Sequence, residues 1–105
     1  MYFRKLLSFL INGFIHFRLR IDMAVENICG ERIREARKEK GLNQIDLVTA
    51  IHDEFGIKMD STSLGRIERN ERGVWDFELV AFSKILDVNI NWLLKIEKEK
   101  QIESD

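Results

Sequence analysis

The chain has 105 residues, is 45% hydrophobic and 33% charged, and carries a formal net charge of −1, all ordinary values for one small globular domain. A single cysteine, Cys29, excludes an intrachain disulfide framework and a cysteine-based zinc site, and favours a reducing, cytoplasmic location. The two histidines, His16 and His52, have no metal-ligand spacing. We therefore expect neither a bound metal nor a cofactor.

The first segment, residues 1–22, is apolar and basic and reads MYFRKLLSFLINGFIHFRLRID. Its apolar stretch from Leu6 to Phe17 is short for a membrane span. Residues 15–22 alternate between apolar and polar side chains, as a strand does. We interpret residues 1–22 as an accessory segment, with an extended reading frame before Met23 as one explanation. A dimerising strand or helix ranks second and a membrane anchor third.

From Met23 onward the pattern is helical, and residues 23–96 are expected to form one all-α domain of five helices. The first helix is predicted over residues 31–40, with Ile33 and Ala36 on one face, and ends at Gly41. Asn43 caps the second, which is expected to bury three residues, Leu47, Val48 and Ile51. Residues 52–60 are expected to form a connection around Gly56.

The third helix is predicted from Ser61 to about residue 70, with Leu64 and Ile67 facing inward. Gly65 interrupts it with the residue of lowest helix propensity apart from proline. We assign Gly65 to an outward stripe, where a missing side chain would permit close contact with a partner molecule.

Two further helices complete the domain. Asp76 is expected to cap the fourth helix, whose inward face is formed by Leu79, Val80, Phe82, Ser83 and Leu86. Asn89 or Asn91 starts the fifth helix. Core or interface packing is the favoured interpretation of both Trp75 and Trp92. Residues 97–105 form a charged tail.

Positive charge is concentrated in two segments of this nearly neutral chain. Residues 31–42 carry five basic and three acidic side chains, and residues 58–72 carry four basic and three acidic ones. Residues 43–57 contain three acidic residues and no lysine or arginine. A local basic face on the surface is therefore consistent with the sequence. We find no phosphate-binding glycine loop, nucleophile elbow or Cys/His dyad, so an enzyme is the least favoured class.

Four separated blocks resemble the helix-turn-helix domain of phage repressors and Cro proteins, the xenobiotic-response-element family. They are Arg32-Ile33 with Arg37, then GLNQIDL (41–47), LGRIERN (64–70) and LDVNINWLL (86–94). The resemblance covers about residues 29–95, and RGVWDFELVAFSKIL resembles a subgroup with a longer second helix. The chain departs from the family in the enlarged link before Leu64, in Val48 on the second helix and in Asn70 at the usual glycine position.

The resemblance implies a lambda-repressor-like fold and a DNA-binding transcriptional regulator, most simply a small dimeric repressor in the cytoplasm. The third helix would enter the major groove of double-stranded DNA. The base-reading positions implied are Ser61, Thr62, Gly65 and Arg66. The implied phosphate contacts are Asn43, Gln44, Lys58, Arg69 and Arg72. Arg37 and Glu68 would form an internal pair, and Ile90, Trp92 and Leu93 would supply a dimer contact.

Two alternatives stay open at this point. In the first, the chain is an antitoxin that binds DNA through this domain and a partner protein through residues 1–22 or the charged tail. In the second, weaker alternative, the N-terminal segment tethers a regulator to a membrane.

Overall fold

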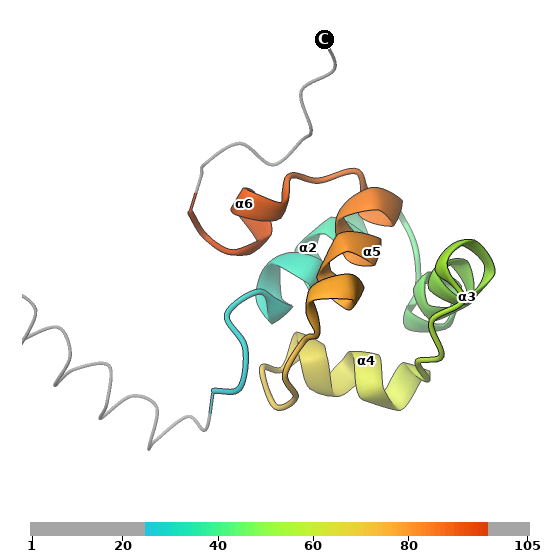
Figure 1. Ribbon diagram of the computed structural model, residues 1–105, viewed down its shortest axis with the longest axis horizontal. Helices are drawn as coiled ribbons and strands as arrows, with labels where there is room; N and C mark the ends of the chain where they lie inside the picture. The colour runs from blue at the N-terminus through green and yellow to red at the C-terminus, as the bar shows by residue number, and fades with distance from the viewer. Residues whose placement is uncertain (1–24, 97–105) are drawn as a thin grey trace, which may run out of the picture.

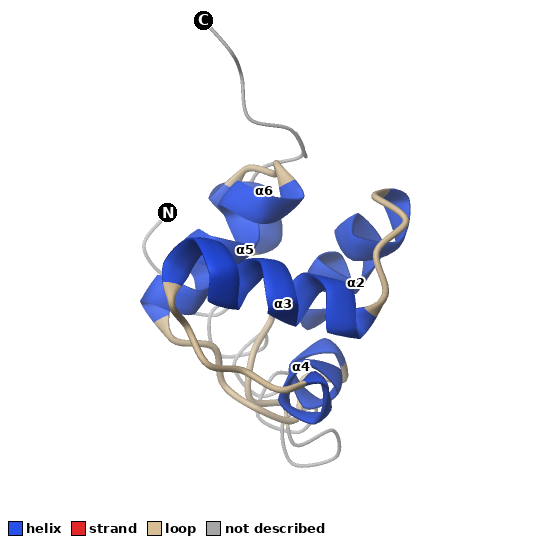
Figure 2. Cartoon of the chain, turned by 90° about the vertical axis from the view of Figure 1, so that its right-hand side faces the viewer, coloured by secondary structure: helices blue, strands red, loops and turns tan. Residues whose placement is uncertain are grey.

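The computed structural model describes residues 25–96, which form five helices and no strand (Figures 1 and 2). The helices are α2 (Gly30–Glu39), α3 (Gln44–Phe55), α4 (Ser61–Glu68), α5 (Asp76–Leu86) and α6 (Ile90–Leu93). The predicted all-α class is therefore confirmed for this part of the chain. The expectations for residues 1–22 and for the charged tail lie outside the described residues.

The predicted helix starts rest on side chains that cap the first turn. Asn43 accepts a hydrogen bond from the backbone N–H of Asp46, whose carboxylate accepts the backbone N–H of Asn43 in return. The Asp60 side chain accepts the N–H of Ser63, and Asn89 accepts the N–H of Asn91. Such caps satisfy backbone donors that have no partner inside the helix, which is why short polar residues mark helix starts in a sequence.

Left-handed residues end several of the helices. Gly56 closes α3 at φ 68°, Asp87 closes α5 at φ 55°, and Asn70 follows α4 at φ 62°. Because α3 runs to Phe55, the predicted connection of residues 52–60 is too long, and the link to α4 covers only residues 56–60.

One hydrophobic core joins all five helices. α5 packs against α2, α3 and α6, and α4 packs against α2 and α3. Figure 1 shows α5 in front of α2 and between α3 and α6. The buried core residues are Cys29, Ile33, Ala36, Leu47, Val48, Ile51, Leu64, Ile67, Ala81, Phe82, Leu86, Val88, Trp92 and Leu93. The inward residues predicted for the first three helices all belong to this core.

The sequence reading of α5 needs two corrections. Val80, expected inside, is 41% exposed, and Ala81 occupies the buried position instead. Trp75, for which core or interface packing was favoured, is 64% exposed, which excludes the core and leaves an interface as a prediction. It precedes the helix as its N-cap residue, so α5 begins at Asp76 rather than one residue later. Trp92, by contrast, is buried as expected, with the guanidinium of Arg32 lying 4.9 Å from its ring centre.

Asn27 joins the start of α2 to the end of α4. Its Oδ1 accepts the backbone N–H groups of Cys29 and Gly30, while its Nδ2 donates to the carbonyls of Ile67 and Arg72 at 3.0 and 2.7 Å. A Cβ on Gly30 would lie 2.0 Å from the carbonyl oxygen of Ile67, so only glycine permits this close approach. The C-terminal end of α4 is thereby anchored to the body of the domain.

None of the helices in residues 25–96 has the length and apolar character that crossing a membrane requires.

Candidate nucleic-acid interface

Helix α4 lies on the surface with one face in the core and the opposite face in solvent. Leu64 and Ile67 are fully buried, whereas Thr62, Arg66 and Arg69 are exposed. Ser61 is half-buried at the edge of the exposed face. The exposed residues fall at spacings of three and four along the helix, so their side chains form one continuous stripe.

Arg66 is the cation of this stripe whose charge is not paired within residues 25–96. Among the described residues, its guanidinium has no hydrogen-bond or ion-pair partner. Arg69, which is also exposed, forms an ion pair with Glu71, and its Nε donates to Oε2 of that carboxylate at 2.9 Å. The five donors of an unpaired guanidinium are available to two adjacent acceptors on another molecule.

Gly65 is placed differently from the sequence expectation. It is buried, and a Cβ built on it would lie 3.5 Å from Nε2 of Gln44 and 3.2 Å from Nη1 of Arg69. The assignment of Gly65 to the outward stripe is therefore wrong. The glycine faces the start of α3, where a Cβ would make an ordinary contact with Gln44 and a closer one with the guanidinium of Arg69. Its position three residues before the inward-facing Glu68 was the signal in the sequence that could have indicated this.

The pairing of Arg37 with Glu68 that the family resemblance implies is present and buried. Nε and Nη2 of Arg37 donate to the two carboxylate oxygens of Glu68 at 2.7 and 3.0 Å, and Nη1 donates to the carbonyl of Leu42 at 2.9 Å. Both side chains are less than one-tenth exposed. A bidentate pair with further hydrogen bonds is the geometry in which burial of two charges is tolerated.

Gln44 extends this network from α3. Its Nε2 donates to Oε1 of Glu68 at 3.1 Å, so a single carboxylate holds residues from α2 and α3 against α4. One amide hydrogen of the Gln44 side chain is used in this contact, and one remains. The side chain is thus fixed in orientation beside Gly65 rather than free in solvent.

The N-terminus of α3 lies next to these residues. The capping box of Asn43 and Asp46 uses the third N–H of the helix, and the first two, on Gln44 and Ile45, have no acceptor inside the helix. Free N–H groups and the positive end of the helix dipole favour an anion at this position. The exposed side of α4 and this N-terminus are therefore neighbouring features of one surface.

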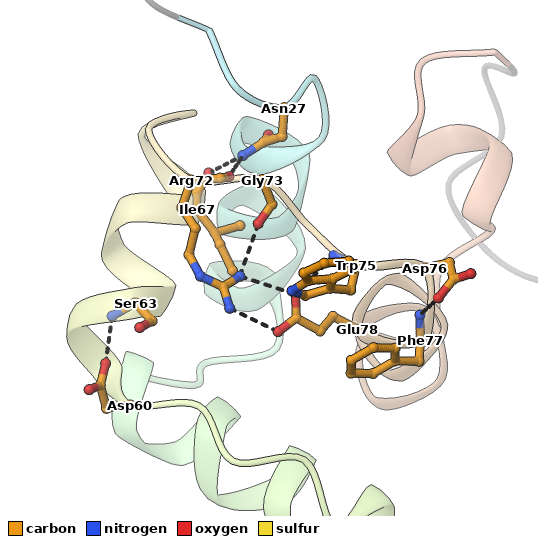
Figure 3. A network of polar contacts seen from close by, with 10 residues as sticks. All are labelled: Asn27, Asp60, Ser63, Ile67, Arg72, Gly73, Trp75, Asp76, Phe77 and Glu78. Atoms are coloured by element: carbon orange, nitrogen blue, oxygen red, sulfur yellow. Dashed lines mark hydrogen bonds and ion pairs between the residues drawn. The ribbon is translucent and has the colours of Figure 1, made fainter.

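Arg72 is not a free cation. It donates to both carboxylate oxygens of Glu78 at 3.0 and 3.1 Å and to the carbonyl of Gly73 at 2.9 Å (Figure 3). The hydrogen bonds with Glu78 raise the pKa of Arg72 above its ordinary value. Since Glu78 is only 3% exposed and also accepts the N–H of Trp75, the pair fixes the start of α5. Arg72 therefore has a structural role, and its phosphate contact stays a prediction.

The remaining implied contacts fall in different places. Lys58 is exposed and lines an open hollow with Val48, Thr49, His52 and Met59, on the side of α3 that faces the α3–α4 link. Of the proposed dimer contacts, Trp92 and Leu93 are 6% and 0% exposed and belong to the core. Ile90 is half-buried. The prediction that all three residues form a dimer contact is therefore wrong, because Trp92 and Leu93 have almost no exposed surface.

Sequence reasoning missed the exposed apolar residues around the start of α5. Trp75, Phe77 and Val80 are 64%, 53% and 41% exposed. The Trp75 and Phe77 rings stack with their centres 6.4 Å apart (Figure 3). The sequence did contain a signal that Val80 is exposed. Asp76 and Lys84 lie four positions before and after it, so Val80 shares one side of the helix with two charged residues.

The chain matches none of the protein-family models against which it was compared. A search of curated proteins also gave no match.

Proposed function

We propose that this protein is a sequence-specific, double-stranded-DNA-binding transcriptional regulator in which α3 and α4 act as a lambda-repressor-like helix-turn-helix. The observation that carries the proposal is the surface formed by α4 and the N-terminus of α3. It combines an exposed stripe of Thr62, Arg66 and Arg69 with two unpaired backbone N–H groups at the start of α3. The residue blocks that resemble the repressor and Cro family support the same assignment.

In the proposed complex, α4 lies in the major groove and presents its exposed stripe to the base edges. Arg66 is the principal base-reading residue, because a free guanidinium can donate to O6 and N7 of one guanine together. Thr62 and Ser61 make hydroxyl contacts with less base preference. Gly65 has no part in direct readout, since it faces Gln44.

Phosphate binding is assigned to the start of α3. The free backbone N–H groups of Gln44 and Ile45 and the remaining amide hydrogen of Gln44 supply donors for one phosphate. Asn43 is committed to its cap through Oδ1, which leaves its amide group for a second contact. Arg69 must break its ion pair with Glu71 to reach DNA. Lys58 contributes only if the DNA backbone passes close to the α3–α4 link.

The charge balance predicts modest affinity for one copy of the domain. With a net charge of −1 on the whole chain, binding depends on a few local donors rather than on a general positive field. Each neutralised phosphate contributes about −0.9 to the slope of log affinity against log salt concentration. We expect a slope of small magnitude for a single half-site.

The test is selection of binding sequences from random double-stranded oligonucleotides, followed by gel-shift titration of the enriched sequence. Arg66→Ala is expected to weaken specific binding by about tenfold or more, because one bidentate base contact contributes about 1–3 kcal/mol. Arg34→Ala is the matched control, since Arg34 is an exposed arginine on α2 outside the α3–α4 pair. Failure to enrich any sequence, or equal losses for both variants, would contradict the proposal.

A further inference from the structure

The solvent-facing side of α5 carries a patch with apolar residues in its middle and opposite charges at its ends. We call Asp76, Phe77, Val80 and Lys84, together with the adjoining Trp75, the α5 face. All five residues are exposed, and no described residue covers them. The opposite side of the same helix is core, with Ala81 and Phe82 fully buried. An exposed group of two aromatic rings and a valine is an uncommon feature unless something binds it.

The order of residues along this face is self-complementary. Asp76 and Lys84 lie four positions before and four positions after Val80, and positions four apart share one side of a helix. If two copies of α5 pack antiparallel about a two-fold axis at Val80, each Asp76 lies opposite the Lys84 of the other copy. Two equivalent ion pairs then flank a central contact of valine and aromatic side chains.

The charged ends of the face are available for this contact. Within residues 25–96, neither Asp76 nor Lys84 takes part in an ion pair. The Asp76 carboxylate accepts only the N–H of Phe77, at 2.7 Å, which leaves its second oxygen free. A two-fold interface requires one surface to match itself, and this sequence of charge, apolar centre and opposite charge meets that requirement.

We propose that the α5 face is a homodimer interface in which two α5 helices pack antiparallel about Val80. A second copy is the favoured occupant because the charge order matches itself, a property that binding to an unrelated protein or to the chain's own N-terminal segment does not require. The use of this dimer to span two DNA half-sites rests on the proposed function, whereas the dimer itself does not.

The interface is expected to be weak. One helix face buries less than the roughly 1,600 Å² of a standard stable interface, so the free protein should dissociate in the micromolar range or above. Two linked copies on DNA bind the second half-site at high effective concentration, which would compensate for the weak contact.

Charge exchange tests the pairing directly in the full-length chain. Sedimentation velocity over a concentration series should show that Asp76→Lys and Lys84→Asp each weaken dimerisation by fivefold or more. The double exchange Asp76→Lys with Lys84→Asp should restore it, because the paired charges are merely reversed. Asp53→Lys, an equal charge change on α3, is the control and should leave the equilibrium unchanged. A monomeric wild-type chain at every concentration, or no restoration by the double variant, would overturn the proposal.

Cysteine cross-linking tests the geometry independently. Val80→Cys should form an intermolecular disulfide under mild oxidation, because the two-fold axis brings the two copies of this position together. Lys84→Cys should not, since its two copies lie about 12 Å apart along the helix axis at 1.5 Å per residue. The native Cys29 is 3% exposed and provides the wild-type background. If residues 1–24 of the same chain cover the face instead, Val80→Cys will stay monomeric and resist thiol reagents, which also overturns the proposal.

DNA titration separates this inference from the proposed function. A dimer-defective variant such as Asp76→Lys should lose affinity for a two-half-site sequence while keeping its affinity for one half-site. If the chain dimerises through α5 and binds no DNA, only the proposed function fails. If it binds half-sites normally and the exchange variants change nothing, only the dimer interface fails.

Discussion

The side-chain amide of Gln44 on α3 donates a 3.1 Å hydrogen bond to the Glu68 carboxylate on α4. The same carboxylate receives the bidentate guanidinium of Arg37 from α2. Three helices therefore meet at one buried negative charge. The orientation of α4 relative to the N-terminus of α3, on which the proposed DNA contact depends, is set at this point.

Removing one partner of this network should be strongly destabilising. Arg37→Ala leaves the Glu68 carboxylate buried without its cation, and we expect the free energy of unfolding to fall by about 3–5 kcal/mol. Urea denaturation followed by circular dichroism measures the change. Lys38→Ala, at the exposed neighbouring position, is the control. A loss below about 1 kcal/mol for Arg37→Ala would show that the pair is not coupled as the distances indicate.

Substitutions at Gly65 should separate stability from binding. Alanine is expected to stabilise the domain by about 0.5–1 kcal/mol, because helix propensity improves and the exposed Arg69 side chain can move the few tenths of an ångström required. Leucine reaches further into the space of Gln44, so it should displace that amide and weaken DNA binding. The measurements are thermal unfolding and gel-shift titration. Equal DNA affinity for Gly65→Leu and wild type would contradict the proposed role of Gln44.

Removal of Arg72 and removal of Arg66 should affect the stability of the fold differently. Arg72→Ala leaves the buried Glu78 without its cation, so unfolding is expected to become easier by about 1–3 kcal/mol. Arg66→Ala removes a side chain with no partner in the described residues, and stability should change by less than about 0.5 kcal/mol. Urea denaturation of both variants in parallel tests this. A stable Arg72→Ala protein that has lost DNA binding would restore the phosphate contact implied by the family resemblance.

The cap of α4 predicts a dependence of stability on acid. Hydrogen bonds from the Ser63 backbone and side chain lower the pKa of Asp60 below its ordinary value. A carboxyl group with a lowered folded-state pKa stabilises the fold above its unfolded-state pKa, and this contribution is lost as pH falls through the folded value. We therefore expect a stability difference between wild type and Asp60→Asn that begins to shrink as pH falls below about 4 and disappears below the lowered folded-state pKa.

Asparagine keeps the capping oxygen, so this variant removes only the titration. The measurement is the midpoint of urea unfolding between pH 2.5 and 7. A constant difference between the two proteins over that range would show that the Asp60 charge does not contribute. Asp53→Asn, at an exposed position on α3 away from a helix start, controls for net charge.

Local interactions explain which parts of the fold the sequence predicted. Asn43, Asp60 and Asn89 mark helix starts because a cap forms with residues two or three positions ahead and needs no distant partner. Ile33 and Leu64 were assigned to the core because helical spacing places an apolar stripe on one side of each helix. Both signals are contained within a few consecutive residues.

Tertiary structure decided what each surface meets. Gly65 borders Gln44, which lies 21 positions earlier, and a periodic pattern says nothing about that neighbour. Trp92, which belongs to the apolar pattern of α6, is buried in the core. Trp75, which directly precedes the apolar pattern of α5, is exposed to solvent. Periodicity identifies an apolar side of a helix, but which helix covers it depends on how all five pack together. The sequence alone therefore determined the helices, their caps and most of the core, and the packing decided which of their faces remain free to bind.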